Sequence, residues 1–113
     1  RANLWNKIFS EVSFDEIYST DYKRTIQTAS PTATAKNIQI KLYNPKTTAI
    51  DSFKKETLGK KVLIVGHSNT TPNFVNQIIN QKIYADIEDT RFGNLYIVTV
   101  NGDTITHQLL KLP

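Results

Sequence analysis

A short run of four apolar residues, Val62–Val65, constrains the fold of this chain more than any other segment. A run of this kind is typical of a central strand in a parallel sheet, buried on both faces. It leads directly into the small-residue turn Gly66–Thr71 and then into Pro72, which suits the first turn of a helix. The sequence therefore predicts a strand, a turn and a helix in the middle of the chain, which is the building unit of α/β proteins.

Helical and strand patterns alternate along the rest of the chain. The first predicted elements are an amphipathic helix (apolar stripe Leu4, Trp5, Ile8, Phe9 and Val12), a strand Glu16–Ser19, and a helix from Tyr22 to about Ala35 that contains Pro31 and has Thr20 or Asp21 as its cap. A half-exposed strand Ile38–Tyr43 and a short helix Ile50–Leu58 closed by Gly59 come next. After the central strand, we expect a helix (apolar stripe Phe74, Val75, Ile78 and Ile79), a polar loop Tyr84–Gly93, and strands Leu95–Val100 and Thr104–Leu112 joined by Asn101-Gly102. This order predicts a three-layer α/β fold. Its mostly parallel sheet has helices on both faces, and the antiparallel C-terminal hairpin adds a strand at one edge.

Composition narrows the class of protein. The 113 residues suit a single domain, residues 1–113, with one modest core. No cysteine is present, which excludes disulfides, thiolate metal sites and cysteine nucleophiles and leaves the cellular compartment open. No apolar run is long enough to span a membrane. The net charge of +4 is moderate and no basic stripe carries aromatic residues, so we expect no nucleic-acid partner.

The first residue, Arg1, already lies inside the pattern of the first helix and has no capping residue before it. We therefore expect the natural protein to have further residues ahead of Arg1, which would include any export signal or lipid anchor.

Two junctions between a strand and a helix carry the residues best suited to chemistry. Arg24 falls in the first turn of the helix after the Glu16 strand, and His67 follows the Val62–Val65 strand. Both turns lie at the same edge of a parallel sheet, so a guanidinium fork and an imidazole can converge on the oxygens of a phosphoryl group. Spacing alone leaves other interpretations open, because such an arginine is more often a surface residue and such a histidine is equally often a structural hydrogen bonder.

The amino-acid sequences of these two segments resemble motifs of a known family. The segment Ile17–Ala29 reads IYSTDYKRTIQTA and resembles the YSS-x-x-x-RT-x-QTA segment of the histidine phosphatase superfamily, the phosphoglycerate mutase-like proteins. The segment Val62–Thr70 is similar to that family's second histidine motif, and the two occur in the family's order. The resemblance implies that Arg24 binds phosphate and that His67 hydrogen-bonds the phosphoryl group without being phosphorylated. It also implies that the turn containing Asn69 contacts phosphate through its backbone, and it requires no metal or cofactor.

The chain departs from the family at the nucleophile, because no Arg-His-Gly or Arg-His-Ala motif occurs in it. We expect that a strand, a nucleophile loop and one arginine, about 15–30 residues by the size of a βαβ unit, are missing from its beginning. The resemblance thus predicts a phosphoric monoester hydrolase in the full-length protein and an inactive chain of 113 residues alone. The general acid is unassigned. Asp51 and Glu56 lie in the right region but are expected to be solvent-facing helix charges, and His107 is expected to have a structural or surface role.

The stretch between Tyr43 and Gly59 has room for only one short helix, where mutases of the family carry a long insertion. An open pocket of this kind favours a phosphatase, with a phosphorylated small molecule or a phosphoprotein as its partner. The sequence does not indicate an oligomeric state.

Two other hypotheses about function are open. A degenerate family member would bind phosphate or a partner without turnover. A serine hydrolase would use Ser68 in Gly66–Thr70, a near match to a nucleophile elbow, with Asp103 and His107 in the α/β-hydrolase order. Thr70 stands where that elbow needs a small residue, which weighs against this reading.

Overall fold

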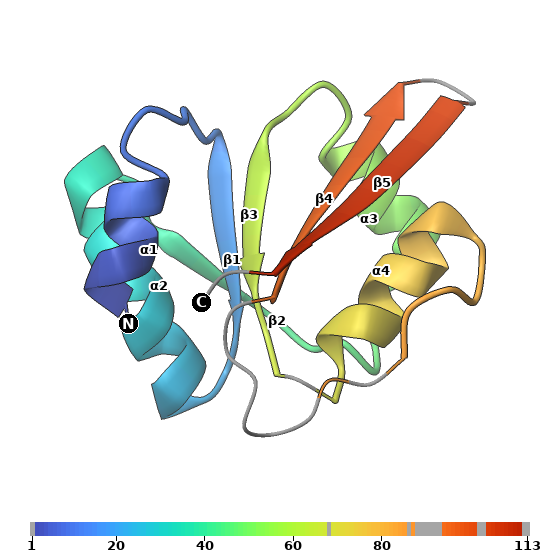
Figure 1. Cartoon of the computed structure of the whole chain (residues 1–113), viewed down its shortest axis with the longest axis horizontal. Coiled ribbons are helices and arrows are strands. Elements are labelled where there is room, and N and C mark those ends of the chain that lie inside the picture. The colour runs from blue at the N-terminus through green and yellow to red at the C-terminus, as the bar shows by residue number, and fades with distance from the viewer. Residues whose placement is uncertain (1, 68, 86, 88–93, 102–103, 112–113) are drawn as a thin grey trace. The chain divides into compact units, whose positions relative to one another are not determined.

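Helices and strands follow one another in the predicted order (Figure 1). This computed structural model describes residues 2–67, 69–85, 87, 94–101 and 104–111. The elements are α1 (Ala2–Ile8), β1 (Glu16–Thr20), α2 (Lys23–Lys36), β2 (Ile40–Tyr43), α3 (Ile50–Glu56), β3 (Val62–Val65), α4 (Thr71–Ile79), β4 (Asn94–Asn101) and β5 (Thr104–Lys111). They form two compact units: the first comprises Arg1–Ala49 and Gly59–His67, and the second comprises Ile50–Leu58 and Ser68–Pro113.

The first unit is built on a three-stranded parallel sheet with the order β2-β1-β3. Ile17 of β1 stands opposite Ile40 of β2 on one side and Leu63 of β3 on the other. Strand β1 therefore bonds to a neighbour along both edges, and its five residues are all buried. The predicted parallel sheet is confirmed for these three strands.

The central strand is β1, and the expectation that Val62–Val65 is central and buried on both faces is wrong. All four residues of β3 are only partly buried. The reason is their place in the sheet, since among the described residues β3 pairs with β1 alone and so stands at its edge. An apolar run cannot by itself distinguish a central strand from an edge strand that packs well.

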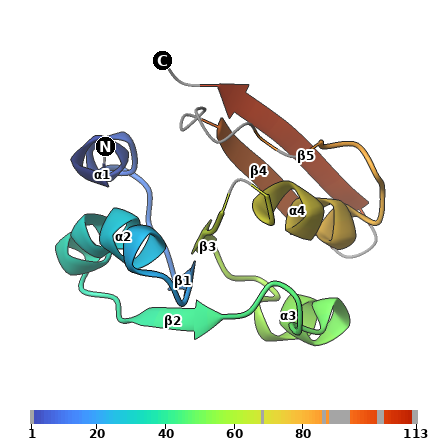
Figure 2. The same ribbon diagram turned by 90° about the horizontal axis from the view of Figure 1, so that it is seen from below.

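Helix α2 covers one face of this sheet, and α1 packs beside α2 (Figure 2). The core between α2 and β1 consists of Ile17, Ala29 and Ala33. Partly buried apolar side chains surround it: Phe14, Ile38, Ile40, Leu63 and Val65. The small alanines let the helix approach the sheet closely, so the position of α2 along β1 is determined by packing.

Helix α2 is one continuous helix that contains Pro31, beginning at Lys23 rather than restarting near the proline. Its N-cap is Tyr22, whose side chain makes no capping bond, and not Thr20 or Asp21 as predicted. Thr20 is unsuited to this role because it is the last residue of β1 and its side chain bonds elsewhere. At the other end, Asn37 adopts a left-handed conformation (φ 56°) and closes the helix.

The second unit contains an antiparallel hairpin, β4 and β5, paired from Asn94 opposite Lys111 to Asn101 opposite Thr104. Helix α4 packs on this hairpin with the predicted stripe buried, and Phe74 meets Phe53 of α3 edge to face at 5.4 Å between ring centroids. The fold is therefore α/β, with a parallel sheet, helices and a C-terminal hairpin. The hairpin was expected to extend the parallel sheet, but within the described residues β4 and β5 form a separate two-stranded sheet. Gly102 of the predicted turn lies outside the described residues.

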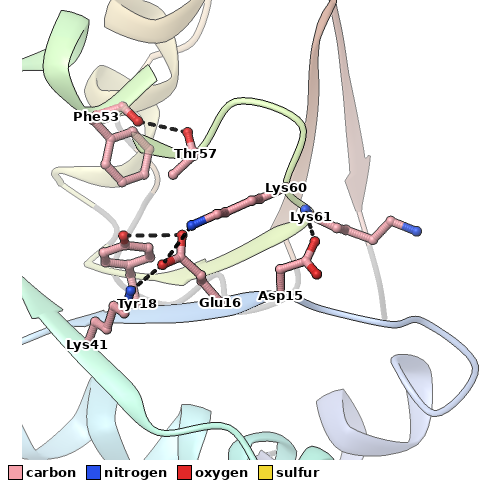
Figure 3. A network of polar contacts seen from close by, with 8 residues as sticks. All are labelled: Asp15, Glu16, Tyr18, Lys41, Phe53, Thr57, Lys60 and Lys61. Atoms are coloured by element: carbon pink, nitrogen blue, oxygen red, sulfur yellow. Dashed lines mark hydrogen bonds and ion pairs between the residues drawn. The ribbon is translucent and has the colours of Figure 1, made fainter. Parts of the chain in front are cut away.

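A charged network holds the amino-terminal ends of the three parallel strands (Figure 3). The Glu16 carboxylate, whose side chain is 8% exposed, pairs with the ammonium groups of Lys41 in β2 and Lys60 ahead of β3. The hydrogen bond from Lys41 lowers the pKa of Glu16 below its ordinary value of 4.5, against the opposing effect of burial. Beside it, Asp15 and Lys61 exchange two hydrogen bonds, with the Lys61 N–H donating to the Asp15 carboxylate and the Asp15 N–H to the Lys61 carbonyl.

We expect Glu16→Gln to lower the free energy of unfolding at pH 7 by about 1 kcal/mol, because the lysines are partly exposed and regain water when the pair is lost. Since the pKa of Glu16 is lowered in the folded state, its contribution is complete above pH 4.5 and disappears as the pH falls through the folded value. Urea denaturation of both proteins across this pH range measures the difference. The exposed helix residue Glu56 supplies the control, Glu56→Gln; an equal loss in that variant would contradict the role of Glu16.

Candidate phosphate-binding site

The junctions after β1 and β3 meet at the carboxyl edge of the parallel sheet. Ser19 and Val65 stand opposite each other in the paired strands, so the segments that follow them emerge side by side. The rings of Tyr22 and His67 are in contact, 4.2 Å between centroids and nearly perpendicular at 89°. The convergence predicted for these two turns is therefore present within the first unit.

Hydroxyl groups determine the course of the β1–α2 junction. The buried Thr20 hydroxyl donates to the Thr25 hydroxyl at 2.9 Å. The Thr25 oxygen also lies 2.9 Å from the Thr20 carbonyl and 3.0 Å from the Tyr22 carbonyl, either of which can accept its single proton. Thr25 lies in the first turn of α2, so this cluster ties the helix start to the strand end. It thereby sets where the neighbouring Arg24 leaves the backbone.

Arg24 is exposed and lies in the first turn of α2 beside Lys23. That turn contains no acidic residue. The first turn of a helix carries unpaired N–H groups and a partial positive charge, so two cationic side chains there are unfavourable for the helix by itself. The same arrangement favours a bound anion.

His67 is half-buried at the end of the segment that follows β3. Burial, and secondly the positive charge of Arg24, lower the pKa of His67 below its ordinary value of 6.5. The imidazole is therefore mainly neutral at pH 7, when one ring nitrogen carries a proton to donate. The segments that carry Arg24 and His67 emerge side by side from β1 and β3, which accounts for the influence of the guanidinium charge on the imidazole.

A guanidinium, an imidazole and a helix N-terminus at one edge of a sheet can together bind a tetrahedral oxyanion. The guanidinium offers several N–H donors in a planar fork, and the imidazole offers one more. A dianion placed between them would raise the pKa of His67, because opposite charge favours the imidazolium form. The positive charge of the site would thus increase as the anion binds, because His67 takes up a proton.

Asn69, the third predicted site residue, is exposed in the turn before α4 and belongs to the second unit. Its assignment to the phosphate pocket stays a prediction from the motif. Asp51 and Glu56 are both exposed on α3, which confirms that they are solvent-facing helix charges. Ser68 and Asp103, two members of the serine hydrolase reading, lie outside the described residues.

His107 is held in a structural cluster of the second unit. Its Nδ1 lies 2.6 Å from the Tyr84 hydroxyl, and the Tyr84 ring also packs edge to face against Tyr96. The buried side chain of Asn76 fixes the same segment, accepting from the Tyr84 N–H at 2.9 Å and donating to the Tyr84 carbonyl at 2.8 Å. The expected structural role of His107 agrees with these contacts.

Sequence reasoning missed Tyr22 and Thr25 as parts of the site. Thr25 stands inside the motif Arg24-Thr25, so the motif itself was the available signal. The sequence indicates Tyr22 only as the first residue of a helix, and nothing in the periodicity marks a contact with His67, which is 45 positions later in the chain.

A shallow depression near the end of α2 is lined by residues without charge: Ser30, Ala33, Thr34, Asn37, Ile38, Gln39 and Ile40. Within the part of the chain that the structure describes, no three side chains of His, Asp or Glu gather to hold a metal ion. In the same part of the chain, no helix has the length and apolar character needed to cross a membrane.

Comparisons with models of known families, with characterised proteins and with solved structures give no match for this chain. The resemblance to the histidine phosphatases therefore depends on the two motifs and on the chemistry of the site.

We expect the pKa of His67 to lie below 6.5 and to rise toward that value in Arg24→Gln, without fully reaching it, since burial is the larger cause. Titration of the imidazole resonances by NMR measures this shift. The matched control is Lys23→Gln, which removes the same charge one residue earlier and should change the pKa less. Because the folded pKa is lowered, the contribution of His67 to stability is complete above pH 6.5 and declines as the pH falls from there to the folded pKa. A pKa at or above 6.5 in the wild-type chain would contradict this account.

Proposed function

We propose that this chain forms the phosphate-binding part of a phosphatase of the histidine phosphatase type, which hydrolyses a phosphomonoester or a phosphorylated protein residue. The observation that carries the proposal is the ring contact of His67 with Tyr22, two residues before Arg24, at the carboxyl edge of the parallel sheet, where the first turn of α2 contains only basic charges. Cationic and imidazole groups concentrated at such an edge are typical of sites for anionic ligands.

In the proposed reaction, the chain's own residues bind and polarise the phosphoryl group. Arg24 holds two phosphoryl oxygens with its fork, and His67 donates a hydrogen bond to a third. Both interactions strengthen as charge develops in phosphoryl transfer, where electrostatic stabilisation is the main contribution. A nucleophilic histidine attacks phosphorus as the bond to the leaving oxygen breaks, and water then releases inorganic phosphate from the phosphohistidine. That histidine is not among these 113 residues, which lack an Arg-His-Gly or Arg-His-Ala motif.

The proposal includes two finer points. The architecture is a three-layer fold with helices on both faces of the mostly parallel sheet. Asn69 contributes its backbone to the phosphate pocket, as the motif implies.

One alternative has an observation in its favour. The absence of the nucleophile motif from the sequence fits a family member that binds phosphate or a partner without turnover. Both proposals share the pocket of Arg24 and His67 and differ only in the chemistry performed on the bound group.

We expect the 113-residue chain to bind inorganic phosphate and to lose about tenfold or more of that affinity in Arg24→Ala, since hydrogen bonds to a charged group contribute about 1.5–3 kcal/mol. NMR titration with phosphate measures the affinity and shows whether the resonances of His67 and Tyr22 shift. The control is Lys7→Ala, which removes one positive charge from the exposed surface of α1 in the same unit. Equal losses in both variants would mean nonspecific attraction, and the proposed pocket would be wrong.

A second experiment distinguishes enzyme from binder. In a longer form of the protein that contains an Arg-His motif, a phosphatase of this type forms an acid-labile phosphohistidine, and Arg24→Ala abolishes its formation. Acid and alkaline treatment of the labelled protein identifies the phosphoryl linkage. Arg24-dependent phosphate binding without any labelled protein would favour the inactive binder, and normal phosphatase activity in Arg24→Ala would rule out the proposed pocket.

A further inference from the structure

Tyr22 presents a large exposed ring at the proposed phosphate site. Its residue is 59% exposed, yet its ring lies 4.2 Å from the imidazole of His67, measured between centroids. The side chain makes no capping bond to α2. A tyrosine with most of its surface in water, in contact with a site histidine, has an aromatic surface available to a ligand.

Hydrogen bonds hold the backbone of Tyr22. Its N–H donates to the Thr20 carbonyl at 2.9 Å, its carbonyl accepts from the Ile26 N–H at 3.0 Å, and the Thr25 hydroxyl lies 3.0 Å from the same carbonyl. The ring therefore projects from a fixed point of the β1–α2 junction. A tyrosine has few rotatable bonds, so such a ring can contact a ligand at little cost in conformational entropy.

Tyr22 also stands two residues before Arg24, so its ring and the guanidinium leave the same short segment. A phosphoryl group held by Arg24 and His67 carries its ester substituent through a single oxygen atom. The substituent must consequently lie close to the phosphate, in the neighbourhood where the ring of Tyr22 is found.

We propose that Tyr22 selects for aryl phosphomonoesters by packing its exposed ring against the aromatic leaving group. This inference rests on the proposed function, because it requires the phosphoryl group to be held by Arg24 and His67. Aromatic pairs favour offset-stacked or edge-to-face contacts, and they gain more than the burial of apolar surface alone. A small alkyl phosphate has no ring to contribute and gains little from Tyr22.

The test compares two ligands on one site. We expect phenyl phosphate to bind the wild-type chain about fivefold more tightly than methyl phosphate, as an aromatic pair of moderate strength predicts. In Tyr22→Phe this preference persists, because the ring is retained. In Tyr22→Ala it falls to about one, and in Tyr22→Leu it falls to an intermediate value, because leucine still buries apolar surface but offers no aromatic ring. The control is Leu42→Ala, which removes another exposed apolar side chain of the first unit and should preserve the preference.

The ratio of the two affinities separates selectivity from folding, because a general loss of structure weakens both ligands alike. If phosphate binding does not depend on Arg24, the proposed function fails and this inference fails with it. If binding depends on Arg24 but the ratio is unchanged in Tyr22→Ala and Tyr22→Leu, only this inference is overturned. Free phosphotyrosine and a phosphotyrosine peptide distinguish the sources of the aryl phosphate: tighter binding of the peptide indicates a protein substrate, and equal binding indicates a small molecule.

Discussion

The first unit depends on the two-sided pairing of β1. A strand that forms parallel ladders along both edges pairs its backbone groups on both sides, and it can therefore be buried at every residue. The register also decides where the chain leaves the sheet. Since Ser19 stands opposite Val65, the segments leading to Arg24 and to His67 begin at the same level. A slip of one residue in this register would turn the side chains of one strand to the other face and separate the two segments.

Burial of β1 also buries its polar side chains, which lose their contact with water. Glu16, Ser19 and Thr20 are all buried, and each has a partner: the lysines for Glu16, a carbonyl for Ser19 and the hydroxyl of Thr25 for Thr20. A buried polar group without a partner would cost more than these bonds contribute, so the bonds make the position of β1 specific. The charged network lies at the amino ends of the strands and the hydroxyl cluster at the carboxyl end. The two ends of the strand thus have different chemistry, one suited to an ion pair and the other to an anion site.

Local patterns predicted the element order well and the sheet order poorly. Turn residues and helical stripes act over a few positions, which is why β3 was placed from Val62 to Val65 and Gly59, with φ 75°, was recognised as a helix terminator. Which strand is central depends on pairing between distant segments, and the apolar run Val62–Val65 does not reveal that Glu16–Thr20 takes that place. Hydrogen bonds and ion pairs of its polar side chains allow Glu16–Thr20 to be buried, and no periodicity reveals them. In the site, Arg24 and His67 could be named because adjacent parallel strands end at one edge, whereas the ring contact of Tyr22 depends on a side-chain orientation that spacing does not specify.

In the proposed site, the charges at the carboxyl edge of the sheet favour a dianion such as a phosphoryl group over a singly charged carboxylate. Lys23 and Arg24 stand at the positive end of α2, and no acidic residue in that turn offsets them. A second full charge on His67 would add repulsion, and the lowered pKa of His67 keeps the imidazole mostly neutral at pH 7. A monoanion could be bound by the guanidinium alone. A dianion brings enough negative charge to balance both the guanidinium and a proton taken up by the imidazole, so a ligand of that charge gains more from the arrangement than a monoanion does.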